Sequence, residues 1–240
     1  MRAGVAVALF AASACWSSDE QITRLQARPA TPTVAAETGA HALGLDPGRD
    51  GALFVPKNLN PAAPAPLIVL LHGAGQSSDL FRFAYPIAEE LGVVVLALDS
   101  RDATWDGIRG SFGADVTFLD RALRHVFERV TVDPKRVALG GFSDGASYAL
   151  SLGLINGDLF THLVAFSPGF ITAPAPRLGK PVIFISHGTQ DRVLNIDRAS
   201  RLLVPALKGD GYDVTYREFD GPHFVPEPIA REALAWLNGR

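Results

Sequence analysis

The feature that most constrains this chain is a serine between two glycines, in the order Gly-Phe-Ser-Asp-Gly at residues 141–145. A mostly apolar run over 136–140 precedes it, and small and apolar residues over 146–153 follow it. This context predicts a strand, a sharp turn and a helix, with Ser143 strained at the turn and its hydroxyl above the sheet. The glycines are expected because a Cβ atom there would collide with the neighbouring strand or helix. The pentapeptide predicts a nucleophile elbow, with an ordinary glycine turn as the alternative.

The rest of the chain alternates short apolar runs with stretches of helical spacing. Continuous apolar runs are typical of strands buried on both faces of a parallel sheet. Strands are predicted at 51–55, 67–71, 93–98, 137–142, 162–166, 182–186 and 214–219. Helices are predicted at 78–91, 115–130, 146–153, 197–208 and 227–238. The alternation predicts an α/β protein with one doubly wound, mostly parallel sheet and a single catalytic domain over 43–240.

Two polar residues follow predicted strands where a catalytic triad needs them. A serine hydroxyl requires a general base within hydrogen-bond reach, and the base requires an acid that orients it. Asp191 follows the predicted strand at 182–186, and His223 follows the strand at 214–219. Sites of open α/β sheets lie at the carboxyl ends of strands. The order Ser143, Asp191, His223 therefore predicts a triad with His223 as the base and Asp191 as the acid.

Other acids and histidines have different expected roles. Asp99 also ends a strand and is a second candidate for the acid, whereas Asp197 and Asp220 are expected to be a helix cap and a turn residue. Four of the other five histidines are expected to be structural or to lie outside the site: His41 in the N-terminal tether, His125 on a helix, His162 at a strand start and His187 packed beneath the acid loop. Only His223 has the position required of the base.

Two backbone N–H groups are expected to hold the oxyanion of a tetrahedral intermediate. Asp144, directly after the nucleophile, would supply one from a helix N-terminus, where the helix dipole also helps. Ala74 would supply the other, from the loop after the strand at 67–71. Gly73 and Gly75 would allow the tight bend and border the substrate pocket, and a plain glycine turn is the alternative.

Trp105 lies on another loop that follows a predicted strand. It is interpreted either as a wall of the substrate pocket or as a core aromatic beneath the loop. No insertion between the predicted strands is long enough for a large lid, so an open cleft is expected.

The N-terminal residues are expected to be an export signal. Residues 1–14 hold a short apolar stretch that ends in an Ala-Ser-Ala cleavage site, which is typical of a signal peptide. Cys15, the only cysteine, resembles the lipidated residue of a bacterial lipobox, and ordinary cleavage before it is the alternative. Residues 15–42 are rich in Ser, Thr, Ala and Pro and are expected to form a disordered tether. We therefore expect an exported protein, either periplasmic or extracellular, or attached to the membrane through a lipid on Cys15.

Composition narrows the function classes further. A chain of 240 residues with 48% hydrophobic residues can bury one large core. A formal net charge of -3 gives no basic surface for nucleic acid. The sequence contains no cluster of His, Cys, Asp and Glu with metal-ligand spacing, and no metal or cofactor is expected.

Several segments together resemble the α/β-hydrolase superfamily, and within it the small bacterial phospholipase/carboxylesterase and polyhydroxybutyrate-depolymerase-like esterases. The motifs are Leu-His-Gly-Ala-Gly at 71–75, Thr-Trp-Asp at 104–106, Phe-Leu-Asp at 118–120, the pentapeptide at 141–145, His-Gly-Thr-Gln-Asp at 187–191 and Gly-Pro-His at 221–223. The resemblance extends over residues 50–237. It implies the α/β-hydrolase fold without a large lid, and serine-dependent hydrolysis of carboxylic esters without a cofactor.

The expected function is hydrolysis of short- to medium-chain acyl esters, on small or polymeric substrates, through an acyl-enzyme. A peptidase or amidase on the same fold is one alternative, although such enzymes usually carry an additional domain that gates peptides. A non-catalytic binding protein that kept the hydrolase fold is another, and the Ser143, Asp191 and His223 set argues against it. The natural ester and the oligomeric state are not predicted.

Overall fold

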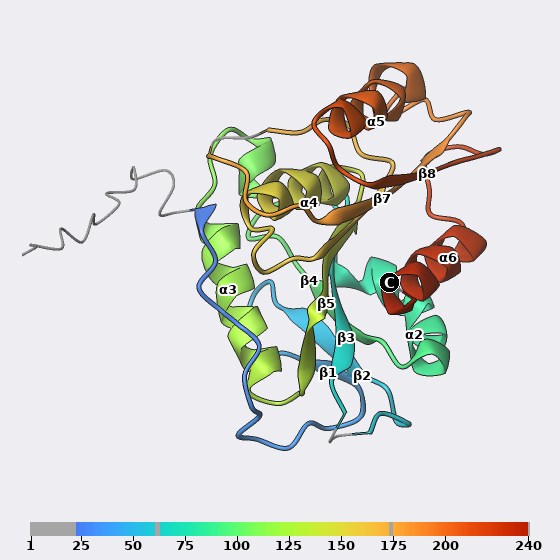
Figure 1. Cartoon of the computed structure of the whole chain (residues 1–240). Helices are drawn as coiled ribbons and strands as arrows, with labels where there is room; N and C mark the ends of the chain where they lie inside the picture. Colours follow the sequence, from blue (N-terminus) through green and yellow to red (C-terminus); the bar gives the residue numbers. More distant parts are fainter. Residues whose placement is uncertain (1–22, 61–62, 173–174, 240) are drawn as a thin grey trace, which may run out of the picture.

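An eight-stranded sheet with helices on both faces forms the computed structural model, which describes residues 23–60, 63–172 and 175–239 (Figure 1). Its strands are β1 (Gly39–Ala42), β2 (Gly51–Val55), β3 (Ala65–Leu71), β4 (Val94–Leu98), β5 (Val132–Phe142), β6 (His162–Phe166), β7 (Val182–Gly188) and β8 (Val214–Phe219). They lie in the order β1-β2-β4-β3-β5-β6-β7-β8. β2 runs antiparallel to β1 and β4, and the pairs from β4 to β8 are parallel. The predicted doubly wound, mostly parallel sheet is confirmed.

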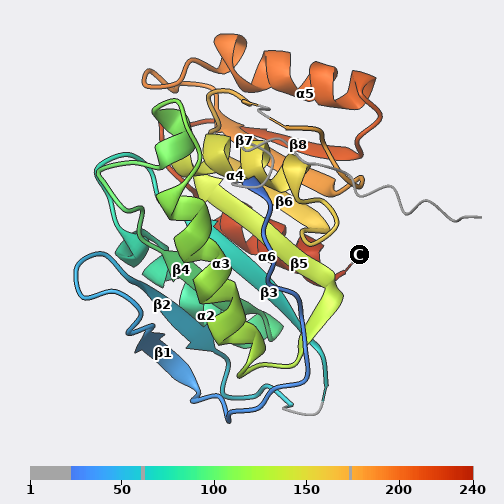
Figure 2. The same ribbon diagram turned by 90° about the vertical axis from the view of Figure 1, so that its left-hand side faces the viewer.

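The helices divide between the two faces of the sheet. One face carries α3 (Ala114–Phe127), α4 (Asp144–Ile155) and α5 (Ser200–Gly209), and the other carries α2 (Tyr85–Leu91) and α6 (Glu227–Asn238). Figure 2 shows α3 and α4 in front of the sheet, with α2 and α6 behind it. Short 3-10 segments complete the chain: η1 (Ser78–Ala84), η2 (Asp106–Ile108) and η3 (Ile196–Arg198).

The sheet is buried on both faces because its central strands are apolar at successive positions. In β3, Val69 and Leu71 pack towards the face that carries α3 and α4, while Ile68 and Leu70 pack towards the face of α2 and α6. All of β3, β4 and β6 is buried. Successive strand residues point to opposite faces, so a strand that separates two cores is apolar at nearly all of its positions.

Two predicted helices differ from the structure at their N-terminal ends. The helix expected over 78–91 is divided into η1 and α2, and Pro86 lies in the first turn of α2, where a missing N–H costs no helical hydrogen bond. The helix expected over 197–208 is divided into η3 and α5. β1 and η2 were not predicted, because each is short and lacks a clear hydrophobic period.

The expectation of a disordered tether over 15–42 is wrong for residues 23–42. Leu25 and Ala27 are buried against the domain. The amide of Leu25 donates to Asn156 Oδ1 at 2.9 Å, and the amide of Ala27 donates to Asp120 Oδ1 at 2.7 Å. We call residues 23–28 the strap. Sequence reasoning missed it because many of its contacts are made by backbone groups, which leave no hydrophobic periodicity in the sequence. His41, placed in the tether, belongs to β1 instead.

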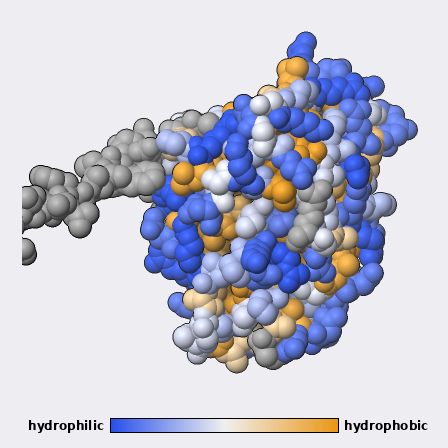
Figure 3. Space-filling view, viewed as in Figure 1, coloured by the Kyte–Doolittle hydropathy of each residue, from blue (hydrophilic) through white to orange (hydrophobic). Residues whose placement is uncertain are grey.

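The predicted signal peptide over 1–14 and the candidate lipidation site Cys15 lie outside the described residues and stay predictions. In the part of the chain that the structure describes, every helix is too short or too polar to cross a bilayer. Figure 3 shows that polar residues cover most of the face seen in Figure 1, with apolar residues in small groups between them.

We expect Asn156→Ala to lower the free energy of unfolding by about 1–3 kcal/mol. The buried Asn156 amide bonds to the Leu25 N–H and to the carbonyls of Thr23 and Leu152, so its loss leaves buried polar groups without partners. Urea denaturation followed by circular dichroism measures the change. Asp158→Ala is the control, because its ion pairs with Arg24 and Arg28 are partly exposed and each contributes at most about 1 kcal/mol. Equal losses in the two variants would contradict this account of the strap.

Candidate active site

The predicted elbow lies between β5 and α4. Ser143 has φ 57° and ψ −120°, a strained conformation for a residue with a side chain. A Cβ atom on Gly141 would lie 2.5 Å from the carbonyl oxygen of Leu71, and one on Gly145 would lie 2.0 Å from the same oxygen. The turn is therefore packed directly against the end of β3. Ser143 itself is buried, with 8% of its surface exposed.

Asp191 and His223 meet at the ends of β7 and β8. His223 Nδ1 lies 2.5 Å from Asp191 Oδ2. The other carboxylate oxygen accepts hydrogen bonds from the backbone amides of Val193 and Leu194, both at 2.8 Å. Asp191 is only 3% exposed, so its orientation is held by protein groups. A carboxylate on Nδ1 keeps a proton on that nitrogen and leaves Nε2 free to accept one.

The hydrogen bonds also keep Asp191 ionised. Burial alone would raise the pKa of Asp191, but hydrogen bonds from His223, Leu194 and Val193 outweigh it and hold the pKa below its ordinary value. The acid is thus a carboxylate wherever the protein is folded near neutral pH.

His223 also contacts the strand that carries the serine. Its ring packs on Phe142, the residue before Ser143, with 4.6 Å between ring centroids. Among the described residues no hydrogen bond joins the Ser143 hydroxyl to His223. Catalytic hydrogen bonds are often long before substrate binds, so the contact between base and nucleophile belongs to the proposal below.

A second histidine, His187, supports the acid loop as expected, and it does so in contact with the acid. Its Nε2 lies 2.7 Å from the carbonyl oxygen of Leu194 and 3.2 Å from Asp191 Oδ2. A carbonyl only accepts, so Nε2 carries the proton and Nδ1 accepts from the Ser200 hydroxyl at 2.7 Å. Burial lowers the pKa of His187 and favours this neutral form. Sequence reasoning missed the contact between His187 and Asp191. The only signal for it was that the two residues are four positions apart in the sequence.

The loop over 72–76 passes beside the nucleophile. A Cβ atom on Gly73 would lie 3.2 Å from Ser143 Cβ, and Gly75 has φ 70°, which favours glycine. The Gly73 amide donates to the Gln76 side chain, and the Gly75 amide donates to the Ala103 carbonyl. None of the described hydrogen bonds uses the amide of Ala74, and this residue is exposed. The loop over 72–76 therefore lies beside Ser143, and the role of Ala74 as an oxyanion donor stays a prediction.

His72 and Arg49 hold this loop in place through hydrogen bonds. The Ser100 amide donates to His72 Nε2 at 3.0 Å, so Nδ1 carries the proton and donates to the Gly73 carbonyl at 2.7 Å. Burial lowers the pKa of His72 and keeps it neutral. Arg49 Nη2 donates to His72 Nε2 and to the Gln76 carbonyl. Sequence reasoning assigned no role to His72, although it is part of the motif at 71–75. It also missed Arg49, which reaches this loop from a distant part of the chain.

Trp105 is a core residue, and its interpretation as a pocket wall is wrong. It is 1% exposed, and its Nε1 donates to the His72 carbonyl at 2.8 Å. The ring packs against Tyr148 of α4 at 5.4 Å between centroids. Trp105 therefore supports the oxyanion loop from inside the protein and does not reach substrate.

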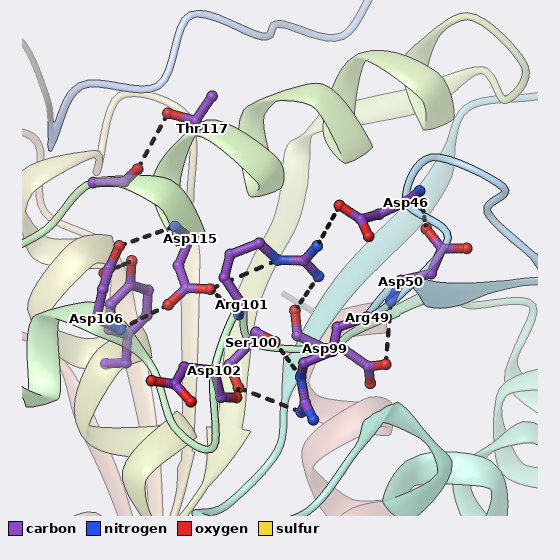
Figure 4. A network of polar contacts seen from close by, with 12 residues as sticks. Asp46, Arg49, Asp50, Asp99, Ser100, Arg101, Asp102, Asp106, Asp115 and Thr117 are labelled. Atoms are coloured by element: carbon purple, nitrogen blue, oxygen red, sulfur yellow. Dashed lines mark hydrogen bonds and ion pairs between the residues drawn. The ribbon is translucent and has the colours of Figure 1, made fainter.

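Asp99, the second candidate for the acid, belongs to a separate polar network (Figure 4). Its carboxylate accepts from the amides of Ser78 and Asp50, and it makes no contact with His223 among the described hydrogen bonds. In the same network Asp115 is buried and accepts from the amides of Arg101 and Asp106. These bonds order the loop after β4.

That loop also fixes the side chain of Asp144. The Thr104 hydroxyl donates to Asp144 Oδ2 at 2.7 Å, which turns the carboxylate towards the loop. The Asp144 amide stands at the first position of α4, where the helix dipole favours negative charge. Asp144 and Ala74 are thus placed on the two segments that border Ser143.

The other candidates have structural roles. Asn195, and not Asp197, caps the helical segment η3, because its side chain accepts from the Asp197 amide. Asp220 accepts from the Gln190 side chain. His162 is buried in β6 against Trp236, and His125 is half-buried on α3. The described residues include no group of three or more His, Cys, Asp and Glu side chains arranged to hold a metal ion.

Two hollows meet at His223. The first, called the apolar hollow, has a volume of about 240 Å³ and is lined by Gln76, Leu80, Phe83, Phe142, His223, Phe224 and Val225. The second, called the polar hollow, has a volume of about 720 Å³ and is lined by Thr189, Gln190, Asp191, Arg192, Val193, Asn195, Pro222 and His223. The base therefore stands between two spaces of different size and chemistry.

Comparisons with known proteins agree with this architecture. The bifunctional acetylxylan esterase/xylanase XynS20E of Neocallimastix patriciarum is 30% identical over 164 residues, which are 65% of this chain and 23% of that protein. Feruloyl esterase D of Neurospora crassa is 25% identical over 171 residues, which are 65% of this chain and 58% of that protein. The chain thus spans less than two thirds of the length of either relative.

Solved structures show the same fold. Esterase PE8 has a TM-score of 0.64 at 23% identity, covering 79% of this chain and 97% of that one. The Bacillus cereus carboxylesterase has a TM-score of 0.60 at 20% identity, covering 80% of this chain and 95% of that one. A family model described as the alpha/beta hydrolase family matches residues 68–238. The chain belongs to the alpha/beta hydrolase family.

Proposed function

We propose that this protein hydrolyses carboxylic esters through Ser143, His223 and Asp191. The observation that carries the proposal is the 2.5 Å contact between His223 and a buried, ionised Asp191, at the edge of the sheet where the strained Ser143 lies. An ionised acid on Nδ1 sets the tautomer in which Nε2 can take the serine proton. The relatives named as esterases support the same activity.

The reaction would proceed in two halves. Ser143 Oγ attacks the ester carbonyl carbon while His223 Nε2 accepts the hydroxyl proton, and the carbonyl oxygen becomes an oxyanion. His223 then donates the proton to the leaving alcohol, and an acyl-enzyme remains on Ser143. Water, deprotonated by His223, attacks the acyl carbon. His223 then returns this proton to Ser143 Oγ as the bond between Oγ and the acyl carbon breaks, which releases the carboxylic acid and the free serine.

The amides of Ala74 and Asp144 are proposed to bind the oxyanion. They lie on the loop after β3 and at the start of α4, the two segments adjacent to Ser143. Because His72, Arg49 and Trp105 hold this loop in place, the donors need little rearrangement when the charge forms.

The apolar hollow favours short or medium acyl groups. Its volume of about 240 Å³ is one third of that of the polar hollow. Phe83, Phe142 and Phe224 line it, so an acyl chain or a small ring can be buried there. A long acyl chain would extend beyond the hollow into solvent, where its further methylenes gain little.

We expect Ser143→Ala and Asp191→Asn to lower kcat/KM on 4-nitrophenyl butyrate by about 10⁴-fold or more. In Asp191→Asn the amide oxygen would stay on the amides of Val193 and Leu194, and the NH₂ group would face His223 Nδ1. This arrangement selects the wrong imidazole tautomer. Asp220→Asn is the matched control, because its exposed side chain can still accept from Gln190. Full activity in Asp191→Asn would refute the proposed triad, and cleavage of peptide amides faster than esters would favour the amidase alternative.

We expect 4-nitrophenyl butyrate to be hydrolysed with a kcat/KM at least about tenfold above that of the palmitate ester, since the hollow encloses only the shorter chain. Phe224→Ala removes one wall of the apolar hollow and should lower kcat/KM for the butyrate. The residues proposed to transfer protons are unchanged, so the pH profile of this variant should match that of the wild type. Faster hydrolysis of long-chain emulsions would contradict the assignment of the hollow.

We expect the stability difference between the wild type and Asp191→Asn to shrink as pH falls from 5 to 3. The folded-state pKa of Asp191 lies below its ordinary value of about 3.9, so its stabilising contribution is complete above about pH 4 and is lost as pH falls through the folded pKa. Urea unfolding at several pH values measures the difference. Ser143→Ala has no titrating group in this range and should show a constant difference from the wild type, and a pH-independent gap for Asp191→Asn would be the contrary result.

A further inference from the structure

The polar hollow borders His223 and shares no lining residue with the loop over 72–76. It shares His223 and Asp191 with the catalytic site, but it includes neither Gln76 nor Phe142. The apolar hollow includes both of these residues, together with His223. Phe142 adjoins the nucleophile, and Gln76 belongs to the loop that carries Ala74. The apolar hollow therefore adjoins the loop over 72–76 and the residue before Ser143, whereas the polar hollow adjoins His223 and Asp191.

The position of His223 assigns the acyl part of the ester to one hollow and the alcohol part to the other. The leaving oxygen must reach His223 Nε2 to be protonated, while the carbonyl group must stay between Ser143 and the oxyanion amides. The acyl part then enters the apolar hollow, which adjoins the residue before Ser143. The alcohol part departs past His223 into the polar hollow.

The lining of the polar hollow offers both donors and acceptors. Among the described contacts, the guanidinium of Arg192 takes part in no hydrogen bond or ion pair, and Arg192 is exposed. Asn195 uses its Oδ1 on the Asp197 amide, so its NH₂ group is left to donate. Gln190 donates its NH₂ group to Asp220, so its oxygen is left to accept. The Thr189 hydroxyl can do both.

This mixture fits a neutral alcohol with several hydroxyl groups. Each hydroxyl of such an alcohol donates one hydrogen bond and accepts others, so it can match both kinds of partner. An apolar alcohol would strip water from these groups without replacing the hydrogen bonds, which is unfavourable. An anionic alcohol would find a single cation in the lining, Arg192, with the buried Asp191 behind the surface and Asp220 bonded to Gln190 outside the lining.

We infer that the polar hollow is the alcohol subsite for a hydroxyl-rich alcohol of the sugar class, with Arg192 as its main donor. The inference rests on the proposed ester hydrolysis and names the substrate class for it. The hollow has three times the volume of the apolar hollow, about 720 Å³ against about 240 Å³. The substrate is thus a small apolar acyl group carried on a larger sugar.

The test compares two esters with one acyl group, glucose monobutyrate and ethyl butyrate, on the full chain. We expect wild-type kcat/KM to be higher for the glucose ester. Arg192→Ala should lower kcat/KM for the glucose ester by roughly three- to tenfold, mainly through KM, and change that for ethyl butyrate less than twofold. Arg192→Gln, which keeps a donor but no charge, should retain part of the preference. Arg198→Ala is the matched control, since this exposed arginine lies outside the polar hollow.

Three results would overturn the subsite while leaving ester hydrolysis intact. The first is a wild-type preference for ethyl butyrate, and the second is an equal loss of kcat/KM on both esters in Arg192→Ala. The third is a kcat/KM for the glucose ester that is as low in Arg192→Gln as in Arg192→Ala, which would mean that charge and not hydrogen bonding matters. Failure of the wild type to cleave either ester, with Ser143→Ala as the blank, would instead refute the proposed function and the subsite with it.

Discussion

The contact between the elbow and the end of β3 places every other part of the site. Gly141 and Gly145 approach the Leu71 carbonyl so closely that neither position can carry a Cβ atom. This close packing holds Ser143 in its strained conformation and brings the loop after β3 within van der Waals distance of it. A strained residue persists only where the surrounding structure over-determines it, and the core strands β3 and β5 supply that rigidity.

The acid and the base depend on a second set of buried contacts. Asp191 receives hydrogen bonds from two backbone amides and from His223, and it also contacts His187. These hydrogen bonds keep its carboxylate charged despite its burial. His187 in turn is held by Ser200 at the start of α5. The orientation of His223, the proposed base, is therefore coupled through Asp191 and His187 to a helix on the outside of the sheet.

Local patterns predicted much of the fold. The apolar runs at β3 and β4 and the glycines around Ser143 each obey a short-range rule, so the parallel sheet and the elbow could be predicted before the structure was known. Asp191 and His223 could be predicted because each directly follows a strand. The strap over 23–28 could not, because backbone amides bind Asn156 and Asp120 from segments far away in the chain. Trp105 was ambiguous because a loop aromatic can face either the pocket or the core.

The sequence by itself determined the order of the strands along the chain, the elbow and the identity of the residues that follow each strand, because these depend on neighbouring residues and on the two-residue period of strands. Only the tertiary structure decided that Arg49 and Trp105 hold the loop over 72–76 in place, that His187 contacts Asp191, and that an apolar and a polar hollow meet at His223. Those contacts join segments that are distant in the chain, and the packing of the whole sheet sets their distances.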